Sequence, residues 1–328
     1  MITRPRIRIA YLPCILADVD PHLLRTFVSV ARLGSFSAAA AELGYTQSAV
    51  SQHVAALEQD LGARLLTRRP VAPTPAGARL LEHAGPLLVR LAAARADVAR
   101  LVSAPAGRLA VGLAPLTAQA AAPGAALAAA CRAHPGVEVT VEVRPAARLP
   151  AAVATGELDL ALVEGFAAPT DPLRLPDVGP LRSVQVGEEP LAVLLPEGHP
   201  LAGRPRLRLA DLAGARWLDA PDAGVALDRL RAAAGTGGFR TGLRYAGSDP
   251  GGLLPLAAAG LGLALLPRSR AAAGASLGLR AVPLSEPRLV HRTELLHPAR
   301  LTPPGGTLRD HLLRARGAPS PPAPSPAP

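Results

Sequence analysis

The hydrophobic pattern of this chain changes near Arg108, and the change limits the folds that the chain can adopt. Between residues 21 and 101 the apolar residues recur at helical spacing, as in Leu24, Phe27 and Val28. From Arg108 onward, short apolar runs typical of strands alternate with helical runs. A helical region followed by an alternating region predicts a multidomain α+β protein with mostly parallel sheets in its second part.

Glycines and capping residues divide the first region into short helices. Gly34 ends the first helix, and Ser35 is placed to cap the second, which stops at Gly44. Thr46 is placed to cap a third helix. Apolar residues in that helix step by four, three and four, which predicts one buried face made of Val50, Val54, Leu57 and Leu61.

A hairpin and a long helix are predicted next. Pro70 and Pro73 exclude a helix after Gly62, and the arginine-rich segment there is typical of a two-stranded wing. A long helix begins at Thr74 and is expected to kink at Pro86. Its heptad seam is made of Leu80, Ala84, Leu87, Leu91, Ala94, Val98 and Leu101. The seam predicts an interchain coiled coil, and the alternative is a helix that packs on its own domain.

In the second region we expect strands and helices in alternation. The expected strands lie within 108–115, 137–145, 158–165, 189–201, 239–247 and 261–271, and the expected helices within 124–134, 148–157, 225–235 and 251–260. No apolar run approaches the roughly 18–20 residues of a membrane span, so we expect no membrane partner.

The charge of the chain points to an anionic partner. The formal net charge is +10, and all 35 basic residues are arginine. Residues 21–103 carry nine arginines against five acidic residues, so the first domain is the place to expect a nucleic-acid surface. The two cysteines, Cys14 and Cys131, exclude a disulfide framework and favour a reducing cytoplasm. Cys131 lies in an alanine-rich helical segment and is predicted to be a core residue.

Enzyme and cofactor motifs are missing from the sequence. The run Gly260–Leu266 lacks the third glycine of a dinucleotide fingerprint and leads from helix to strand, the reverse of the order that such a site needs. The eight histidines are scattered, and no metal-ligand spacing is present. We therefore expect no catalysis, no cofactor and no metal.

The second and third helices with the corner between them have the layout of a helix-turn-helix, in which the second helix of the pair enters the major groove. The exposed face of the third helix is predicted to present Gln47, Ser48, Ser51, Gln52 and Ala55. Glutamine can bond adenine in a bidentate manner, and serine can bond several base edges. This helix contains no arginine, so its neighbours must supply the attraction to phosphate.

The stretch from Leu23 to Ala84 resembles the winged helix-turn-helix of LysR-type transcriptional regulators, and the similarity extends over residues 19–316. The resemblance implies an effector domain of two α/β subdomains like periplasmic-binding-protein type 2, a dimer through the long helix, and often a tetramer. It implies a DNA-binding set of Ser35, Ser37, Thr46, Gln47, Ser48, Ser51, Gln52, Arg64, Arg68 and Arg69. Many members have proline at the position of Ser48 and arginine at the position of Gln52, so the resemblance does not give the operator sequence. We expect the phosphate contacts to come from Arg64, Arg68, Arg69 and Arg32.

Ligands of two-lobed folds bind between the lobes, near strand ends and helix N-termini, where free N–H groups favour anions. The candidate effector residues are Pro115, Leu116, Thr117, Val163, Glu164, Gly165, Asp219, Ala220, Pro221, Ser248 and Asp249. Ordinary capping and turn roles are the alternative for each. The resemblance implies a small-molecule effector, often a carboxylate.

The functional prediction is a cytoplasmic regulator that binds double-stranded promoter DNA, with RNA polymerase as a further partner. The alternative is a solute-binding receptor that uses the C-terminal part. The expected divisions are 1–18, an artefactual extension, unstructured arm or export signal; 19–74, the winged domain; 75–104, the dimerisation helix; 107–316, the effector domain; and 317–328, a disordered tail. Within the effector domain we expect subdomain I at 107–181 and 267–316 and subdomain II at 182–266.

Overall fold

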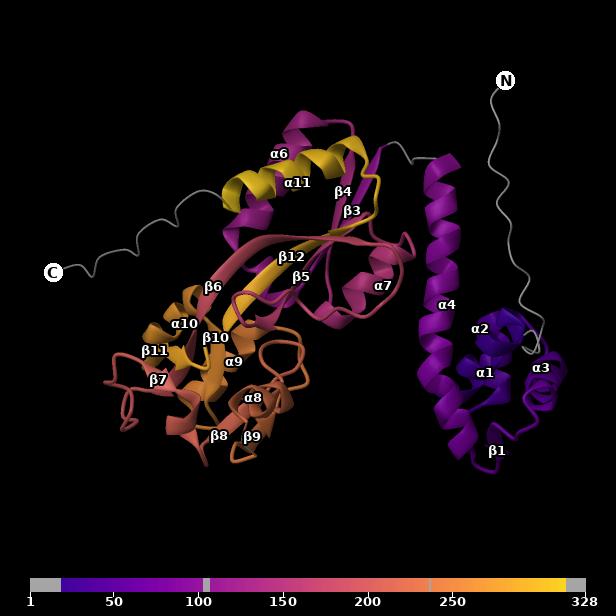
Figure 1. The fold of residues 1–328 in the computed structure, drawn as a ribbon, viewed down its shortest axis with the longest axis horizontal. Helices are drawn as coiled ribbons and strands as arrows, with labels where there is room; N and C mark the ends of the chain where they lie inside the picture. Colours follow the sequence, from indigo (N-terminus) through magenta and orange to yellow (C-terminus); the bar gives the residue numbers. More distant parts are fainter. Residues whose placement is uncertain (1–18, 103–106, 236, 317–328) are drawn as a thin grey trace, which may run out of the picture. The chain divides into compact units, whose positions relative to one another are not determined.

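The computed structural model describes residues 19–102, 107–235 and 237–316, and the expectations for 1–18 and 317–328 lie outside these ranges. The chain divides into two compact units, and the division falls between Leu91 and Ala92, within one long helix. Figure 1 labels the elements along the chain.

The first unit has the predicted winged helix-turn-helix order. Its elements are α1 (Pro21–Leu33), α2 (Phe36–Leu43), α3 (Gln47–Asp60), β1 (Leu66–Arg68), β2 (Val71–Pro73) and the first part of α4 (Pro75–Val102). The side chains of Ser35 and Thr46 cap α2 and α3 by accepting from the backbone N–H groups of Ala38 and Ala49. Both caps were predicted, because serine and threonine oxygens satisfy the free donors of a first helical turn.

A small apolar core holds these helices together. The side chains of Phe27, Val50, Val54 and Leu57 are fully buried in one cluster. Leu61 was predicted on the same face, and this was wrong. It is the residue that ends α3, and it is 39% exposed because the chain turns away from the core there.

The long helix α4 continues through Pro86. Leu80 and Ala84, the first two residues of the predicted seam, pack into the core of the first unit. Further along, the seam residues Leu87, Val98 and Leu101 are more than half exposed. The start of the seam therefore packs on its own domain, and its later part presents apolar side chains to solvent.

The second unit is a mixed sheet covered by helices. Its strands are β3 (Arg108–Leu113), β4 (Glu138–Val143), β5 (Leu160–Ala167), β6 (Arg182–Pro196), β7 (Leu207–Arg208), β8 (Arg216–Asp219), β9 (Arg240–Arg244), β10 (Ala264–Pro267), β11 (Leu279–Glu286) and β12 (Val290–His297). Its helices are α5 (Pro115–Ala118), α6 (Ala121–Ala133), α7 (Leu149–Ala154), α8 (Leu227–Ala234), α9 (Leu253–Ala258), α10 (Arg268–Ala271) and α11 (Pro303–Arg316).

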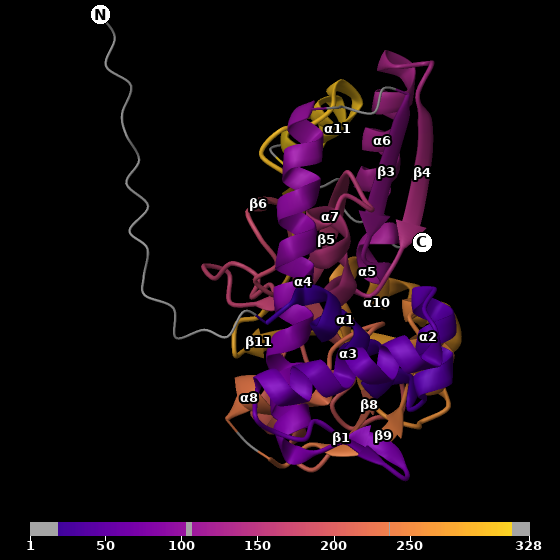
Figure 2. The ribbon, with the colours of Figure 1, turned by 90° about the vertical axis from the view of Figure 1, so that its right-hand side faces the viewer.

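The large sheet has the order β4-β3-β5-β12-β6-β11-β7, and β10 also pairs with β6. Strands β3, β4 and β5 are parallel, as predicted, but β12 is antiparallel to both β5 and β6. The expectation of mostly parallel sheets is therefore wrong at the centre of the sheet. Figures 1 and 2 show α6 alongside β3, and Ala126 and Ala130 of α6 pack there with Leu308 and Leu312 of α11.

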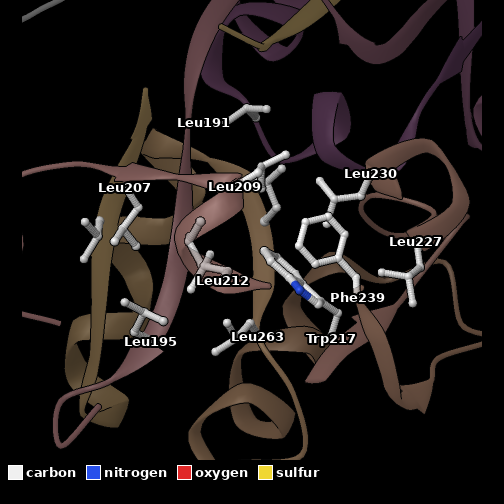
Figure 3. Packing of buried hydrophobic residues seen from close by; sticks show 13 residues of the cluster. Leu191, Leu195, Leu207, Leu209, Leu212, Trp217, Leu227, Leu230, Phe239 and Leu263 are labelled. Atoms are coloured by element: carbon white, nitrogen blue, oxygen red, sulfur yellow. The ribbon is translucent and has the colours of Figure 1, made fainter. Parts of the chain in front are cut away.

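Strand β6 links two parts of the second unit. Its first part pairs with β12, and its second part pairs with β10 and β11. A second core lies beside that second part, with Trp217 edge-on to Phe239 and leucines from β6 and α8 around them (Figure 3). Val282 of β11 belongs to this core. The packing thus joins β11 to the strands expected in subdomain II, although the predicted boundary at residue 267 assigned it to subdomain I.

Among the described residues, no helix combines the length and apolarity needed to cross a membrane. Within the same ranges, no group of three or more histidine, cysteine, aspartate or glutamate side chains lies close enough to hold a metal ion.

Candidate functional site

The N-terminal half of α3 presents a polar, accessible face. Gln47, Ser48 and Gln52 are exposed and Ser51 is half-buried, while the opposite face of the helix lies in the core. The hydroxyl of Thr46 also lies 2.9 Å from that of Ser48, so the first turn is ordered by its own side chains. This is the surface that the sequence predicted for reading base edges.

Arg68, at the end of the wing strand β1, is held against both helices of the helix-turn-helix. Its guanidinium carbon lies 4.8 Å from the centroid of the Phe36 ring at the start of α2. Its Nη1 is 3.4 Å from the hydroxyl of Ser51 on α3. A cation over an aromatic ring is electrostatically attracted to it, so Arg68 is positioned beside the exposed face of α3. The neighbouring Ser37 is exposed.

Glu58 attaches the wing to α3. Its Oε1 accepts from the backbone N–H groups of Leu65, at 2.8 Å, and Leu66, at 3.1 Å. Glu58 therefore satisfies two backbone donors at the start of β1. Arg64 and Arg69 are exposed on either side of this strand.

Arg32 lies outside this group. It forms an ion pair with Glu42, whose carboxylate also accepts from the hydroxyl of Ser29. Hydrogen bonds from Arg32, and secondly from Ser29, hold the pKa of Glu42 below its ordinary value. The charge of Arg32 is therefore already compensated within the domain, which weakens its predicted role in binding phosphate.

In the second unit, one cavity has a volume of about 250 Å³. It lies beside the middle of β6 and β12, next to α5, the start of α6, and α10. Its lining residues are Leu116, Thr117, Ala120, Ala122, Pro123, Leu162, Val186, Gly187, Glu188, Glu189, Ser269, Arg270, His291, Thr293 and Leu312. The pairing of β12 with β6 shifts register at this point, between Thr293 and Glu294. Bulges of this kind re-aim side chains and are common beside functional sites.

The carboxylate of Glu164 is bonded to two residues that line this cavity. One oxygen accepts from the backbone N–H of Leu116 at 2.9 Å; the other accepts from the N–H of Thr117 at 2.6 Å and from its hydroxyl at 2.7 Å. A buried charge needs such partners, and the free N–H groups at the start of α5 provide them. These donors were expected to bind an anionic effector, but the chain supplies the anion itself.

His291 lies diagonally across the strand pair β5–β12 from Glu164, whose direct partner in the register is Thr293. Its Nε2 lies 3.5 Å from the second carboxylate oxygen of Glu164, and its side chain is 6% exposed. This Nε2 has no hydrogen-bond partner among the described residues. The ring of Phe166 lies 5.7 Å away, centroid to centroid. His291 therefore contributes to the lining of the cavity, while its Nε2 is enclosed beside Glu164.

The other predicted effector residues are dispersed. Pro115 and Ala220 are buried, Val163 is in the core, and Gly165 lies against Leu173 with no room for a side chain. Pro221 and Ser248 are exposed and line no described cavity. These placements match the alternative of ordinary structural roles.

Two aspartates of the predicted set act as caps. Asp219 accepts from the backbone N–H of Leu227 at the start of α8. Asp249 accepts from the N–H of Gly251, and its carboxylate lies 3.3 Å from the side-chain amide of Gln119. Of the predicted effector set, Leu116 and Thr117 line the cavity, and Glu164 is bonded to both of them.

Residues that the prediction missed come mainly from β6 and β12. Glu188, Glu189, His291 and Thr293 line the cavity, but they stand in ordinary strand sequence, and only the pairing of β12 with β6 brings them together. The one available signal was the density of charge in the run Gly187–Glu189, which precedes an apolar strand.

Cys131 differs from its prediction. It lies on α6, and its side chain is exposed rather than buried. The helix directs Ala126 and Ala130 into the core, and the next residue along turns out to solvent, since successive helical positions differ by about 100°.

Comparison with known proteins gives two family matches. Residues 21–78 match the model described as bacterial regulatory helix-turn-helix protein, lysR family, and residues 103–316 match the model described as LysR substrate binding domain. The second match alone covers more than half of the chain.

Two relatives and one solved structure are similar to this chain. The chain is 36% identical over 212 residues to the small neutral protease regulatory protein of Streptomyces coelicolor, a match that covers 62% of this chain and 60% of that protein. It is 30% identical over 304 residues to the uncharacterized HTH-type transcriptional regulator YnfL of Escherichia coli, covering 91% of this chain and 99% of that protein. A solved structure of a putative LysR family transcriptional regulator from Pseudomonas aeruginosa covers 91% of this chain and 99% of its own, with 22% identity and a TM-score of 0.49. The chain belongs to the LysR family.

Proposed function

We propose that this protein is a transcriptional regulator that binds specific promoter DNA through α3 and the wing, and that a small molecule in the cavity beside β6 and β12 modulates this binding. The observation that carries the proposal is the polar face of α3 with Arg68 fixed beside it. Such an arrangement has a use in a DNA-binding protein and none in a receptor for solutes.

We assign the base contacts to α3 and the phosphate contacts to the wing. Gln47 and Gln52 offer the amide pairs that suit adenine, and Ser48 offers a small hydroxyl. Arg64, Arg68 and Arg69 on the wing supply attraction to phosphate, which is independent of sequence. Because no arginine stands on α3 itself, specificity is expected to be carried by neutral hydrogen-bonding groups.

The exposed part of the α4 seam supports association of two chains. Leu87, Val98 and Leu101 repeat at heptad positions and are more than half exposed, which is unfavourable in a monomer. A dimer presents two copies of α3, and these would address half-sites about one helical turn apart, roughly 34 Å. A tetramer and a contact with RNA polymerase are further parts of this proposal, and the DNA partner implies a cytoplasmic location.

The effector is proposed to bind in the cavity beside β6 and β12. Thr117, Thr293 and His291 line it together with apolar side chains from α6 and α11. Ligand sites commonly combine an apolar lining with a few polar groups in this manner.

A gel-shift titration with the DNA upstream of the protein's own gene tests the regulator function. We expect a specific complex whose affinity falls as salt rises, because phosphate contacts release counterions. Absence of any complex at low salt would overturn the proposal. It would favour the second candidate, a solute-binding receptor, for which the cavity is the supporting observation.

A further inference from the structure

The wing strand β1 directs the side chain of Arg68 toward the helices. Side chains alternate between the two faces of a strand, so Leu66 and Arg68 share one face and Thr67 lies on the other. Leu66 is buried in the core of the first unit. The face that carries Arg68 is therefore the face that packs on the helices, and Arg68 lies at the edge of this packing, where β1 ends.

The backbone of the wing is fixed at both ends of β1. The carboxylate of Glu58 accepts from two backbone N–H groups at the start of the strand. In the turn, the hydroxyl of Thr67 donates to the backbone oxygen of Pro70 at 2.6 Å and accepts from the N–H of Ala72 at 3.1 Å. Because the backbone is held in this way, the freedom that remains to Arg68 is that of its side-chain torsions.

Two contacts, one with each helix of the helix-turn-helix, restrict this side chain. The guanidinium lies over the ring of Phe36 on α2, and its Nη1 donates to the half-buried hydroxyl of Ser51 on α3. The attraction of the cation to the ring face and the hydrogen bond favour the same orientation. A guanidinium has five N–H donors and the bond to Ser51 uses one, so an exposed Arg68 keeps donors for a phosphate.

The other two arginines of the wing differ from Arg68 in this respect. Arg64 and Arg69 are exposed. Among the described residues, neither of their guanidinium groups has a ring contact, an ion pair or a hydrogen bond. A phosphate that binds one of them must order a flexible side chain, which costs entropy, whereas Arg68 is ordered before it binds. The three charges are equal, but we expect their contributions to the affinity to differ.

We propose that Phe36 and Ser51 are positioning residues for DNA binding, which hold Arg68 in the orientation that meets a phosphate and make it the dominant cation of the wing. This proposal rests on the proposed function of the first unit in binding DNA. It gives Ser51, which the sequence predicted among the base-reading residues, a different role. It also gives Phe36 a role beyond its place in the core.

A double-mutant cycle on the full-length protein tests the proposal, with gel-shift titrations of the DNA upstream of its own gene. Phe36→Leu keeps an apolar side chain and removes the ring face. It should weaken binding by about two- to tenfold per protomer, the range for ordering one long side chain. In an Arg68→Ala background the same substitution should change the affinity by less than about twofold, because the group that it positions is gone. Additive losses would overturn the proposal, since Phe36 would then act without Arg68.

The matched control is the same cycle with Arg69→Ala. Arg69 carries the same charge one residue further along the wing, so Phe36→Leu should show its full loss of affinity in that background. Arg68→Ala should also weaken binding more than Arg64→Ala or Arg69→Ala does. Equal losses in the three arginine variants would mean that charge alone determines the affinity, and would overturn the proposal.

Two further variants separate positioning from core packing. Phe36→Tyr keeps a ring face and should bind DNA within about twofold of the wild type. A loss as large as that in Phe36→Leu would assign the effect to packing and overturn the role of Phe36. Ser51→Ala tests the same role of Arg68 if Phe36→Leu does not fold. It should weaken binding to all sequences alike, by about two- to fivefold, and only where Arg68 is present. A changed preference at one base position would return Ser51 to base reading and overturn its positioning role.

The outcome for the positioning role is separable from the outcome for the function. If the wild-type protein shifts the DNA and the losses in the cycle are additive, the regulator function stands and the positioning role falls. If the wild-type protein gives no complex at low salt, the regulator function falls, and the positioning role falls with it.

Discussion

Arg68 of the wing lies over the ring of Phe36, with 4.8 Å between the guanidinium carbon and the ring centroid, and its Nη1 reaches toward Ser51 on α3. This contact joins three elements that are separate in the sequence: the start of α2, the middle of α3 and the end of β1. The wing arginine is thereby held beside the polar face of α3, and its long side chain loses little further freedom when it binds a phosphate.

Arg68→Ala should weaken binding to all DNA sequences by a similar factor and reduce the salt dependence by roughly one unit per protomer, because a phosphate contact is lost. A gel-shift titration at several salt concentrations measures both quantities. Arg79→Ala is the matched control, since Arg79 carries the same charge but is paired with Glu82 on α4. An equal loss in the two variants would mean that net charge, rather than the position of Arg68, determines the affinity.

Gln52→Ala should cost about 1–3 kcal/mol of discrimination at one base position and have a smaller effect on non-specific binding. Gln52 is exposed on the face of α3 that the core leaves free. Competition between the promoter and single-base variants of it measures this discrimination. Gln59→Ala changes the same residue type in the last turn of α3 and serves as the control. If both substitutions relax the same position, α3 does not enter the groove by its N-terminal half.

Gly77→Ala should loosen the wing. A Cβ at Gly77 would lie 2.0 Å from the backbone oxygen of Leu65, so the start of β1 must move. Overpacking of this kind costs about 1–3 kcal/mol, and hydrogen exchange of the amides in 65–73 should accelerate. Gly85→Ala, in the same helix α4, adds a Cβ that touches no other part of the chain and serves as the control, so exchange in 65–73 should stay unchanged. If the amides in 65–73 still exchange slowly in Gly77→Ala, the contact between the added Cβ and Leu65 is readily relieved.

The double variant Val98→Arg/Leu101→Arg should dissociate the proposed dimer, because both side chains belong to the exposed part of the α4 seam. Charges at these positions would be buried and unpaired in a coiled coil. Sedimentation velocity measures the change in mass. Ala99→Arg places one charge next to the seam, on an exposed position of the same helix, and should leave the assembly intact. If the double variant keeps the mass of the dimer, the interface lies on another surface.

Stability of the second unit should depend on pH through His297. This side chain is 3% exposed, and burial lowers its pKa, although Nδ1 donates to the backbone oxygen of Pro298. Because the unfolded chain binds the proton more readily, the free energy of unfolding should fall as the pH drops below about 6.5 and recover as the pH rises. Thermal unfolding from pH 7.5 to pH 5.5 measures this slope. His297→Gln should have a shallower slope, and an identical slope would assign the effect to other groups.

The sequence by itself determined the elements of the first, DNA-binding unit of this protein. Helix α3, its cap at Thr46, the wing and the polar set on α3 follow from spacings of three to about twenty residues, which are local rules of capping, helical period and turn chemistry. The exception was Leu61, where the helical period was extended one residue past the end of the helix.

Only the tertiary structure decided the cavity. Glu164 bonds to Leu116 and Thr117, which lie 48 and 47 positions earlier in the chain. His291 lies close to Glu164 because β12 inserts antiparallel between β5 and β6. Strand order and register between segments more than a hundred residues apart depend on the packing of the whole sheet, and no local pattern encodes them. For that reason the sequence could place Thr117 and Glu164 at strand ends, but could not show that the glutamate satisfies the threonine's own backbone donor next to the buried ring of His291.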